Sequence, residues 1–329
     1  MSKAVDLSAA ADLQASEPAV QLSLTRAGVT GVSKAIRVRH EGRETVMAAD
    51  IECTVDLDRA QKGVHMSRFP ELFEEAIEAV VDAESLHVEA LAEHIARHIV
   101  ERQSALRAEA RITAHWPLRR TTPVTGLATQ EMVSLVGIAS ASADRVRRVV
   151  GVEANGINAC PCAQGMVRTR AAERLGEAGF AELDIERILE LVPIATHNQR
   201  GRGTLYVGTD SASGRQLDAN DLFRIVEGSM SAPVYELLKR PDELFVVEHA
   251  HLQPRFVEDS VRLSLKGALD ALPDLAGGDF LFARQVNFET IHAHDVLAER
   301  SGTVAELRDE LASATQHERH TTLADWLRL

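Results

Sequence analysis

The sequence predicts an α+β protein in which helices cover one face of an antiparallel sheet. Apolar and polar residues alternate strictly over 47–57, as expected of a strand with one buried and one solvated face. Two stretches with helical spacing of apolar residues follow at 72–81 and 88–99, and alternation returns at 110–116. This order of strands, a helix pair and further strands is typical of a sheet whose helices pack on one side.

The remaining elements of the first half have weaker signals. An alternating segment and its hairpin turn, together 32–43, lead into the strand at 47–57. Cys53 falls on the apolar side of that strand, so we expect it in the core. A loop that begins at Pro117 then leads to a valine-rich strand at 146–154.

The second half repeats this order more loosely, although no internal sequence repeat proves a duplication. In chain order its elements are a helical segment at 171–191, a short strand at 204–207, a helix capped by Asp218 or Asn220, a helix over 256–269 and a strand over 280–288.

We therefore expect four segments. They are a loose N-terminal arm at 1–27, a first unit at 28–155, a second unit with the polar motifs at 156–299, and a C-terminal helical tail at 300–329.

Composition excludes several classes of function. The chain has 329 residues, of which 45% are hydrophobic, but it has no apolar run of about 18 residues and no signal-peptide core at its start. Three cysteines form no even disulfide framework, so we expect a soluble protein in the reducing cytoplasm. A net charge of -13 disfavours nucleic-acid or membrane binding. Basic clusters such as 145–148 could hold a small polyanion or form salt-bridged surfaces.

Two of the three cysteines lie in the tripeptide Cys160-Pro161-Cys162. The proline fixes φ and removes a backbone donor, so we expect a stiff turn that presents sulfur. The spacing differs from the Cys-x-x-Cys of zinc knuckles and thioredoxin-like sites. Two interpretations stay open: a metal-binding or catalytic thiolate, and small buried hydrophobic residues after a strand.

Polar residues further along the chain suit metal-assisted hydrolysis. Cys160, His197 and a carboxylate within 239–243 would suit Zn²⁺ or Fe²⁺ with one position open to water, which such an ion activates near neutral pH. Glu289 follows the last predicted strand, where a fixed carboxylate could accept two hydrogen bonds from an amidine-like edge such as that of guanine. Nearby histidines, including His292, can shuttle protons. Each of these residues alone also has an ordinary structural explanation.

Taken together, these residues resemble the GTP cyclohydrolases of type IB and their archaeal relatives in methanopterin synthesis, which belong to the tunnelling-fold superfamily. The resemblance covers residues 28–296, and five motifs occur in the family's order. They are Gly63-Val64-His65-Met66-Ser67-Arg68-Phe69, Cys160-Pro161-Cys162, His197-Asn198-Gln199-Arg200, Leu237-Leu238-Lys239-Arg240-Pro241-Asp242-Glu243 and Asn287-Phe288-Glu289-Thr290-Ile291-His292.

The resemblance implies a fold, a cofactor and residue roles. It implies tandem tunnelling-fold units whose sheets close into barrels in a homo-oligomer, a dimer or tetramer, with active sites shared between subunits. It implies GTP as substrate and a divalent metal, with Fe²⁺ preferred over Zn²⁺ or Mn²⁺. The implied roles are metal ligation by Cys160, His197 and Glu243 (preferred over Glu248), catalysis by Cys160, His197 and His292, purine anchoring by Glu289, and substrate binding by His65, Arg68 and Arg200.

One departure from the bacterial pattern indicates the subtype. Here 37 positions separate Cys160 from His197, with a helical insert between them, whereas the histidine follows closely in bacterial type IB enzymes. This arrangement resembles the archaeal enzymes, which form 7,8-dihydroneopterin 2′,3′-cyclic phosphate. The alternatives are a bacterial-type enzyme that forms the triphosphate for folate synthesis, a non-catalytic purine- or pterin-binding oligomer with a structural metal, and a redox pair of Cys160 and Cys162.

Overall fold

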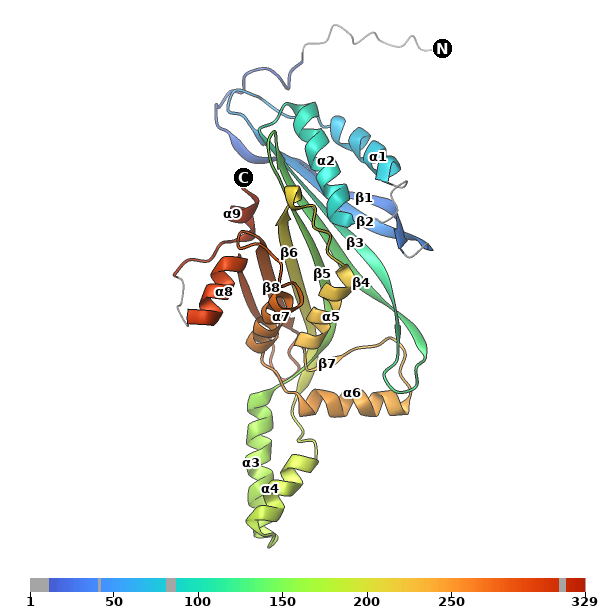
Figure 1. The fold of residues 1–329 in the computed structure, drawn as a ribbon, viewed down its shortest axis with the longest axis vertical. Coiled ribbons are helices and arrows are strands. Elements are labelled where there is room, and N and C mark those ends of the chain that lie inside the picture. Colours follow the sequence, from blue (N-terminus) through green and yellow to red (C-terminus); the bar gives the residue numbers. More distant parts are fainter. Residues whose placement is uncertain (1–11, 41–42, 81–86, 314–317, 329) are drawn as a thin grey trace.

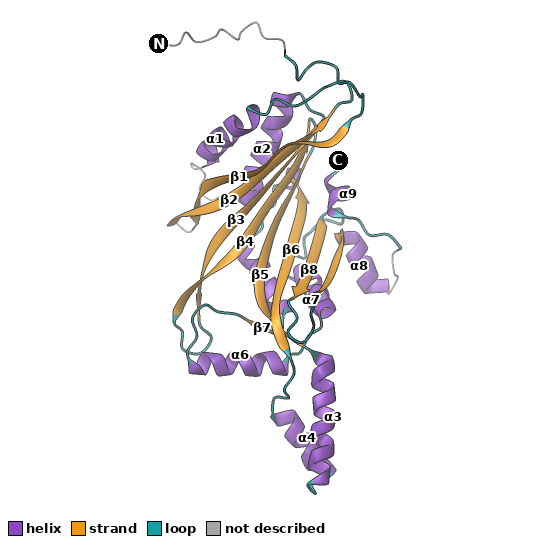
Figure 2. Cartoon of the chain, turned by 180° about the vertical axis from the view of Figure 1, so that it is seen from behind, coloured by secondary structure: helices purple, strands orange, loops and turns teal. Residues whose placement is uncertain are grey.

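The computed structural model describes residues 12–40, 43–80, 87–313 and 318–328. In this part of the chain the strands form one antiparallel sheet in the order β1-β2-β3-β4-β5-β6-β8-β9, with the short β7 paired to β5. Helices α1, α2, α5 and α7 lie on one side of the sheet (Figure 1), and the opposite side is largely open (Figure 2). The expected α+β class, with an antiparallel sheet and helices on one face, is confirmed.

The strands are β1 (Leu24–His40), β2 (Arg43–Leu57), β3 (Arg107–Thr121), β4 (Ala128–Ser142), β5 (Val146–Ala159), β6 (Asn198–Asp210), β7 (Ala232–Pro233), β8 (Phe280–Asn287) and β9 (Val296–Thr303). The helices are α1 (Arg68–Val80), α2 (Val88–Gln103), α3 (Pro161–Glu177), α4 (Glu182–Leu191), α5 (Ala219–Ser229), α6 (Arg240–Leu252), α7 (Val257–Ala271), α8 (Val304–Ser313) and α9 (Leu323–Leu327), with a 3-10 turn at Ser211–Ser213.

Two strand pairs flank a helix pair in each half of the chain, but both halves share one sheet because β4 pairs with β5. The expected boundary at 155/156 falls within β5, and the turn at 143–145 separates the two halves of the topology. The expected tail at 300–329 begins with the end of β9. Residues 1–11 of the expected arm and residues 41–42 of the expected hairpin turn lie outside the described residues.

The main core lies between the sheet and its helices. The alternation over 47–57 is confirmed, because β2 buries every second residue, including Cys53. Three sequence predictions were wrong in detail. The loop expected from Pro117 instead continues β3 and then forms β4, the strand expected at 204–207 extends over all of β6, and α6 and β9 were not predicted.

A second, smaller core lies on the open face, where the C-terminal helix α9 packs. The Trp326 ring stacks on Phe280 with centroids 5.4 Å apart, and its indole N–H donates to the Gly278 carbonyl at 2.9 Å. A Cβ at Gly208 would lie 2.7 Å from the Trp326 ring, so glycine there makes the contact possible. The C-terminus is thus fastened across β6 and β8. Within the described ranges, no helix has the length and apolar character needed to cross a bilayer.

The start of α2 buries an acidic side chain against β4. Gly137 permits this approach, since a Cβ there would lie 2.5 Å from the Val88 carbonyl oxygen. Glu89 is only 4% exposed, and burial raises the pKa of its carboxyl to about 7, against the pull of Arg148. The folded chain therefore binds this proton more tightly than the unfolded chain, and stability falls as pH rises from the unfolded value near 4.5 to about 7.

Glu89→Gln is expected to raise the free energy of unfolding at pH 8 by about 2 to 3 kcal/mol, because each unit of pKa shift corresponds to about 1.4 kcal/mol. At pH 4.5 the wild-type side chain is protonated, so the two proteins should unfold alike. Urea unfolding at both pH values, at one protein concentration, measures the difference. An equal gain at both pH values would mean that burial of the charge is not the cause.

Candidate active site

The polar motifs converge where β5, β6 and β8 end. The last pair of the β5–β6 ladder joins Ala159 to Asn198, and the Cys160 amide donates to the His197 carbonyl at 3.1 Å. The Thr196 hydroxyl donates to the Cys160 carbonyl at 2.8 Å. Residues opposite each other in an antiparallel ladder present their side chains on the same face. The backbone therefore holds Cys160 beside His197 despite the 37 positions between them.

Cys160 is also the N-cap of α3, and its sulfur accepts a hydrogen bond from the Ala163 amide at 3.5 Å. The expected stiff turn is the start of a helix, because proline at the first helical position lacks only an N–H that would have no helical partner. Cys160 is half-buried and Cys162 is exposed, so neither is a small core residue; Cys53 is. Helices α3 and α4 form a hairpin that projects beyond the strand ends (Figure 1).

His197 and Glu289 lie on either side of the amide of Gln199. The His197 Nδ1 is 3.0 Å from the Gln199 Oε1, and the Gln199 Nε2 donates to the Glu289 Oε1 at 3.1 Å. The second Glu289 oxygen lies 3.8 Å from the His197 Nδ1. The His197 and Glu289 side chains are 13% and 6% exposed, which leaves the carboxylate little contact with water.

The segment after Glu289 brings two more histidines. The ring of His292 meets the ring of His197 edge-on, with centroids 6.4 Å apart, and stacks on His294 at 5.3 Å. The Thr290 hydroxyl donates to the Asn198 carbonyl at 3.1 Å, which fastens this segment to β6. His292 is exposed, so it can exchange protons with solvent while it faces His197.

A row of buried polar side chains supports these strand ends and was missed by the sequence reasoning. The Asn158 amide nitrogen donates to the Asn287 Oδ1 at 2.9 Å, and the Gln285 amide donates to the same oxygen at 3.1 Å. A Cβ at Gly201 would lie 2.3 Å from the Gln285 Nε2, so glycine leaves room for the row. Polar residues at inward-facing positions of otherwise apolar strands were the available signal.

Glu243 is not gathered with the site in one chain. It lies in the first turn of α6, whose neighbour Asp242 accepts hydrogen bonds from the Val124 and Thr125 amides in the β3–β4 turn, both at 2.9 Å. The other end of α6 adjoins the site, since the His251 carbonyl accepts from Gln164 at 2.6 Å. These eight positions correspond to about 12 Å along the helix.

The donors in one chain suit a metal only in part. Cys160 and His197 offer the sulfur and nitrogen that borderline divalent ions prefer. Across the described residues, however, no three His, Cys, Asp or Glu side chains form a group that could hold a metal, so neither Glu243 nor Glu248 completes the pair. Further ligands would have to come from solvent, substrate or another subunit.

His65 and Arg68 lie at the opposite end of the strands. His65 contacts Asp12 at 3.3 Å, and its carbonyl accepts from Gln103 at the end of α2. This end adjoins the beginning of β5, a strand of 14 residues, which spans about 40 Å. Within one chain these two residues therefore cannot reach Cys160.

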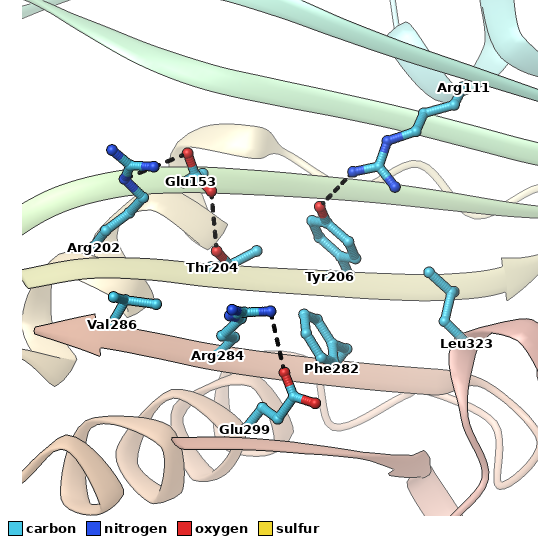
Figure 3. Close-up of a pocket in the computed structure, with 10 residues that line it drawn as sticks. All are labelled: Arg111, Glu153, Arg202, Thr204, Tyr206, Phe282, Arg284, Val286, Glu299 and Leu323. Atoms are coloured by element: carbon cyan, nitrogen blue, oxygen red, sulfur yellow. Dashed lines mark hydrogen bonds and ion pairs between the residues drawn. The ribbon is translucent and has the colours of Figure 1, made fainter. Parts of the chain in front are cut away.

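Arg200 belongs to the open face, because it alternates with Gln199 along β6. That face carries a pocket (Figure 3) in which the Arg111 guanidinium donates to the Tyr206 hydroxyl at 3.0 Å and Arg284 lies 3.4 Å from Glu299. Its arginines are matched by acidic or hydroxyl partners, and the sheet separates it from Gln199.

Comparisons with known proteins agree with this arrangement. Residues 10–298 match the family model described as Type I GTP cyclohydrolase folE2. The chain is 42% identical over 312 residues to GTP cyclohydrolase MptA of Methanococcus maripaludis strain C7, covering 92% of this chain and 98% of that protein. It is 37% identical over 308 residues to GTP cyclohydrolase MptA of Methanocaldococcus jannaschii, with 92% and 98% covered. Uricase from Arthrobacter globiformis has a similar fold, with a TM-score of 0.52 at 10% identity, covering 92% and 98% of the two chains.

Proposed function

Because the chain belongs to the type I GTP cyclohydrolase folE2 family, we propose that it hydrolyses the guanine imidazole ring of GTP, releases formate and forms a dihydropterin. The observation that carries this proposal is the convergence of Cys160, His197, Glu289 and His292 at one end of the sheet. A nucleophilic or metal-binding thiol, a paired imidazole, a buried carboxylate and an exposed imidazole supply the groups that a hydrolytic ring opening needs.

The geometry supports a distinct task for each side chain. Glu289 accepts hydrogen bonds from the guanine N1–H and N2–H, because a buried carboxylate with one contact to Gln199 keeps lone pairs free. His292, exposed and edge-on to His197, moves protons to and from the opening ring.

Cys160 and His197 would hold a divalent metal, for which Fe²⁺ is our first choice and Zn²⁺ or Mn²⁺ the alternatives. When bound, such an ion activates water near neutral pH. A carboxylate such as Glu243 completes the ligand set only if another subunit brings it close.

The archaeal subtype is supported by the MptA relatives and by the α3–α4 hairpin, which fills the long spacing between Cys160 and His197. We therefore expect 7,8-dihydroneopterin 2′,3′-cyclic phosphate for methanopterin-type pterin synthesis. Retention of all three phosphates would instead give the triphosphate of the bacterial type.

The test is anaerobic incubation of the purified protein with GTP and Fe²⁺, with formate measured enzymatically and the pterin identified by fluorescence and mass. We expect formate and a dihydropterin in equal amounts, and the product's phosphorus count decides the subtype. Binding of GTP without formate release, with Fe²⁺, Zn²⁺ or Mn²⁺, would contradict the enzymatic function and favour a purine-binding role.

The active site is proposed to be shared between subunits of a homo-oligomer. In one chain the sheet ends in two edges, β1 and β9, which closure of sheets from several chains into a barrel would pair. His65 and Arg68 lie at the far end of their own strands from Cys160, so a role in GTP binding requires the loop of a neighbouring chain.

Chains with His65→Ala and chains with Cys160→Ala are expected to be inactive separately and to regain activity when refolded together. In a random mixture of a symmetric oligomer, about a quarter of shared sites contain both wild-type halves. Turnover of the mixture is compared with each variant refolded alone, and mass spectrometry verifies that mixed oligomers form. Mixed oligomers without activity would restrict the site to one chain.

A further inference from the structure

One side chain at the strand ends contacts both the imidazole and the carboxylate of the site. Gln199 is 5% exposed, its Oε1 lies 3.0 Å from the His197 Nδ1, and its Nε2 lies 3.1 Å from the Glu289 Oε1. A single buried amide therefore connects the residue proposed to anchor guanine with the residue proposed to bind metal.

The chemistry of Glu289 fixes which way this amide points. A carboxylate that anchors guanine is ionised and only accepts hydrogen bonds, so the amide nitrogen of Gln199 must face it. The reversed amide would place two acceptor oxygens about 3.1 Å apart in a site with little water, which is repulsive. The amide oxygen of Gln199 consequently faces His197.

The orientation of the amide in turn fixes the tautomer of His197. The Gln199 Oε1 can only accept, so the His197 Nδ1 must carry the hydrogen. The second Glu289 oxygen, 3.8 Å from the same nitrogen, favours this tautomer as well. The His197 Nε2 then keeps its lone pair for a metal or a proton.

The surroundings leave Gln199 little freedom to turn. It lies opposite Asn158 in the β5–β6 ladder, and the amide of Asn158 is held by Asn287 at 2.9 Å and by Ser260 at 3.1 Å. Neighbouring positions are thus occupied by amides that already have partners.

We propose that Gln199 is a positioning residue that holds His197 in the Nδ1–H tautomer and aims Glu289 at guanine, so that one amide prepares both halves of the site. This inference rests on the proposed function, because it takes His197 and Glu289 as site residues. It adds a residue whose two hydrogen bonds can be separated by substitution.

The experiment compares Gln199→Met, Gln199→Glu and the matched control Gln285→Met, whose buried amide contacts neither His197 nor Glu289 in the printed hydrogen bonds. Methionine removes both contacts of Gln199. Glutamate keeps an acceptor for the His197 N–H but removes the donor to Glu289 and adds a like charge beside it. Zn²⁺ affinity is measured by chelator competition, and GTP affinity is measured by calorimetry on metal-free protein at pH 8.

We expect Gln199→Met to lose about 10- to 100-fold in Zn²⁺ affinity, as is typical when the partner of a metal-binding histidine is removed, and to bind GTP more weakly. Gln199→Glu should keep wild-type Zn²⁺ affinity and lose GTP affinity, and Gln285→Met should keep both. Wild-type affinities in Gln199→Met, or equal losses in all three variants, overturn the proposal.

Failure of the proposed function gives a different result. If wild type releases no formate but the variants still divide Zn²⁺ binding from GTP binding, the cyclohydrolase activity is wrong and the role of Gln199 stands. If wild type releases formate and Gln199→Met is unaffected in both affinities, the activity stands and the role of Gln199 is wrong.

Discussion

Replacing Cys160 by alanine is expected to lower GTP turnover by about 10³-fold or more, since a metal ion contributes several kcal/mol to the transition state. The thiol lies at the ladder end beside His197, and alanine leaves the Cys160 amide bond to the His197 carbonyl intact. Bound metal, measured by elemental analysis after reconstitution with Fe²⁺, should fall together with turnover.

Cys162→Ala is the matched control. Cys162 is exposed in the first turn of α3, two residues from Cys160, and should keep most of the activity and metal. Equal metal content and activity in wild type and Cys160→Ala would remove Cys160 from the site. Equal loss in the two variants would instead favour a redox pair.

Arg120→Met is expected to destabilise the fold by about 3 to 5 kcal/mol, the usual cost of leaving partners of a buried ion pair uncompensated. The Arg120 guanidinium lies 2.7 Å from Glu131 and 2.6 Å from Glu227, and 4.4 Å above the Tyr235 ring. Burial raises the pKa of both carboxyls, and Arg120 opposes that rise. Without Arg120, two half-buried acids would face each other.

Arg119→Met, at an exposed position next in the chain, controls for loss of charge and should unfold like wild type. Adding Glu131→Gln and Glu227→Gln to Arg120→Met should recover part of the loss in urea unfolding, because the stranded charges are gone. A loss that the added changes deepen would mean that Arg120 stabilises mainly through its stacking on Tyr235.

The elements that the sequence predicted well are those with one dry and one wet face. Alternation over 47–57 and helical spacing over 88–99 come from packing against a single core, so β2 and α2 were clear. β4 was missed because its second half is buried on both faces, with α2 on one side and α9 on the other, which removes the alternation.

The site divides in the same way. The nearness of Cys160 and His197 follows from a ladder whose register no local pattern specifies, and it was expected only through the family resemblance. The role of Gln199 depends on which neighbours its amide meets, and a glutamine in a polar motif carries no sign of that. The position of Glu243 depends on α6, which the motif at 237–243 concealed because its proline and charges look like a loop.

The α3–α4 hairpin has a consequence for protein engineering. Cys160 and His197 are joined by ladder and hydroxyl hydrogen bonds, so the segment between them does not set their separation. The hairpin turns at Gly179, whose φ is +88, and α3 buries no side chain. A foreign domain, an affinity tag or a fluorescent reporter could therefore be grafted at this tip, where it would signal from beside the reaction centre while the strand register keeps the chemistry in place.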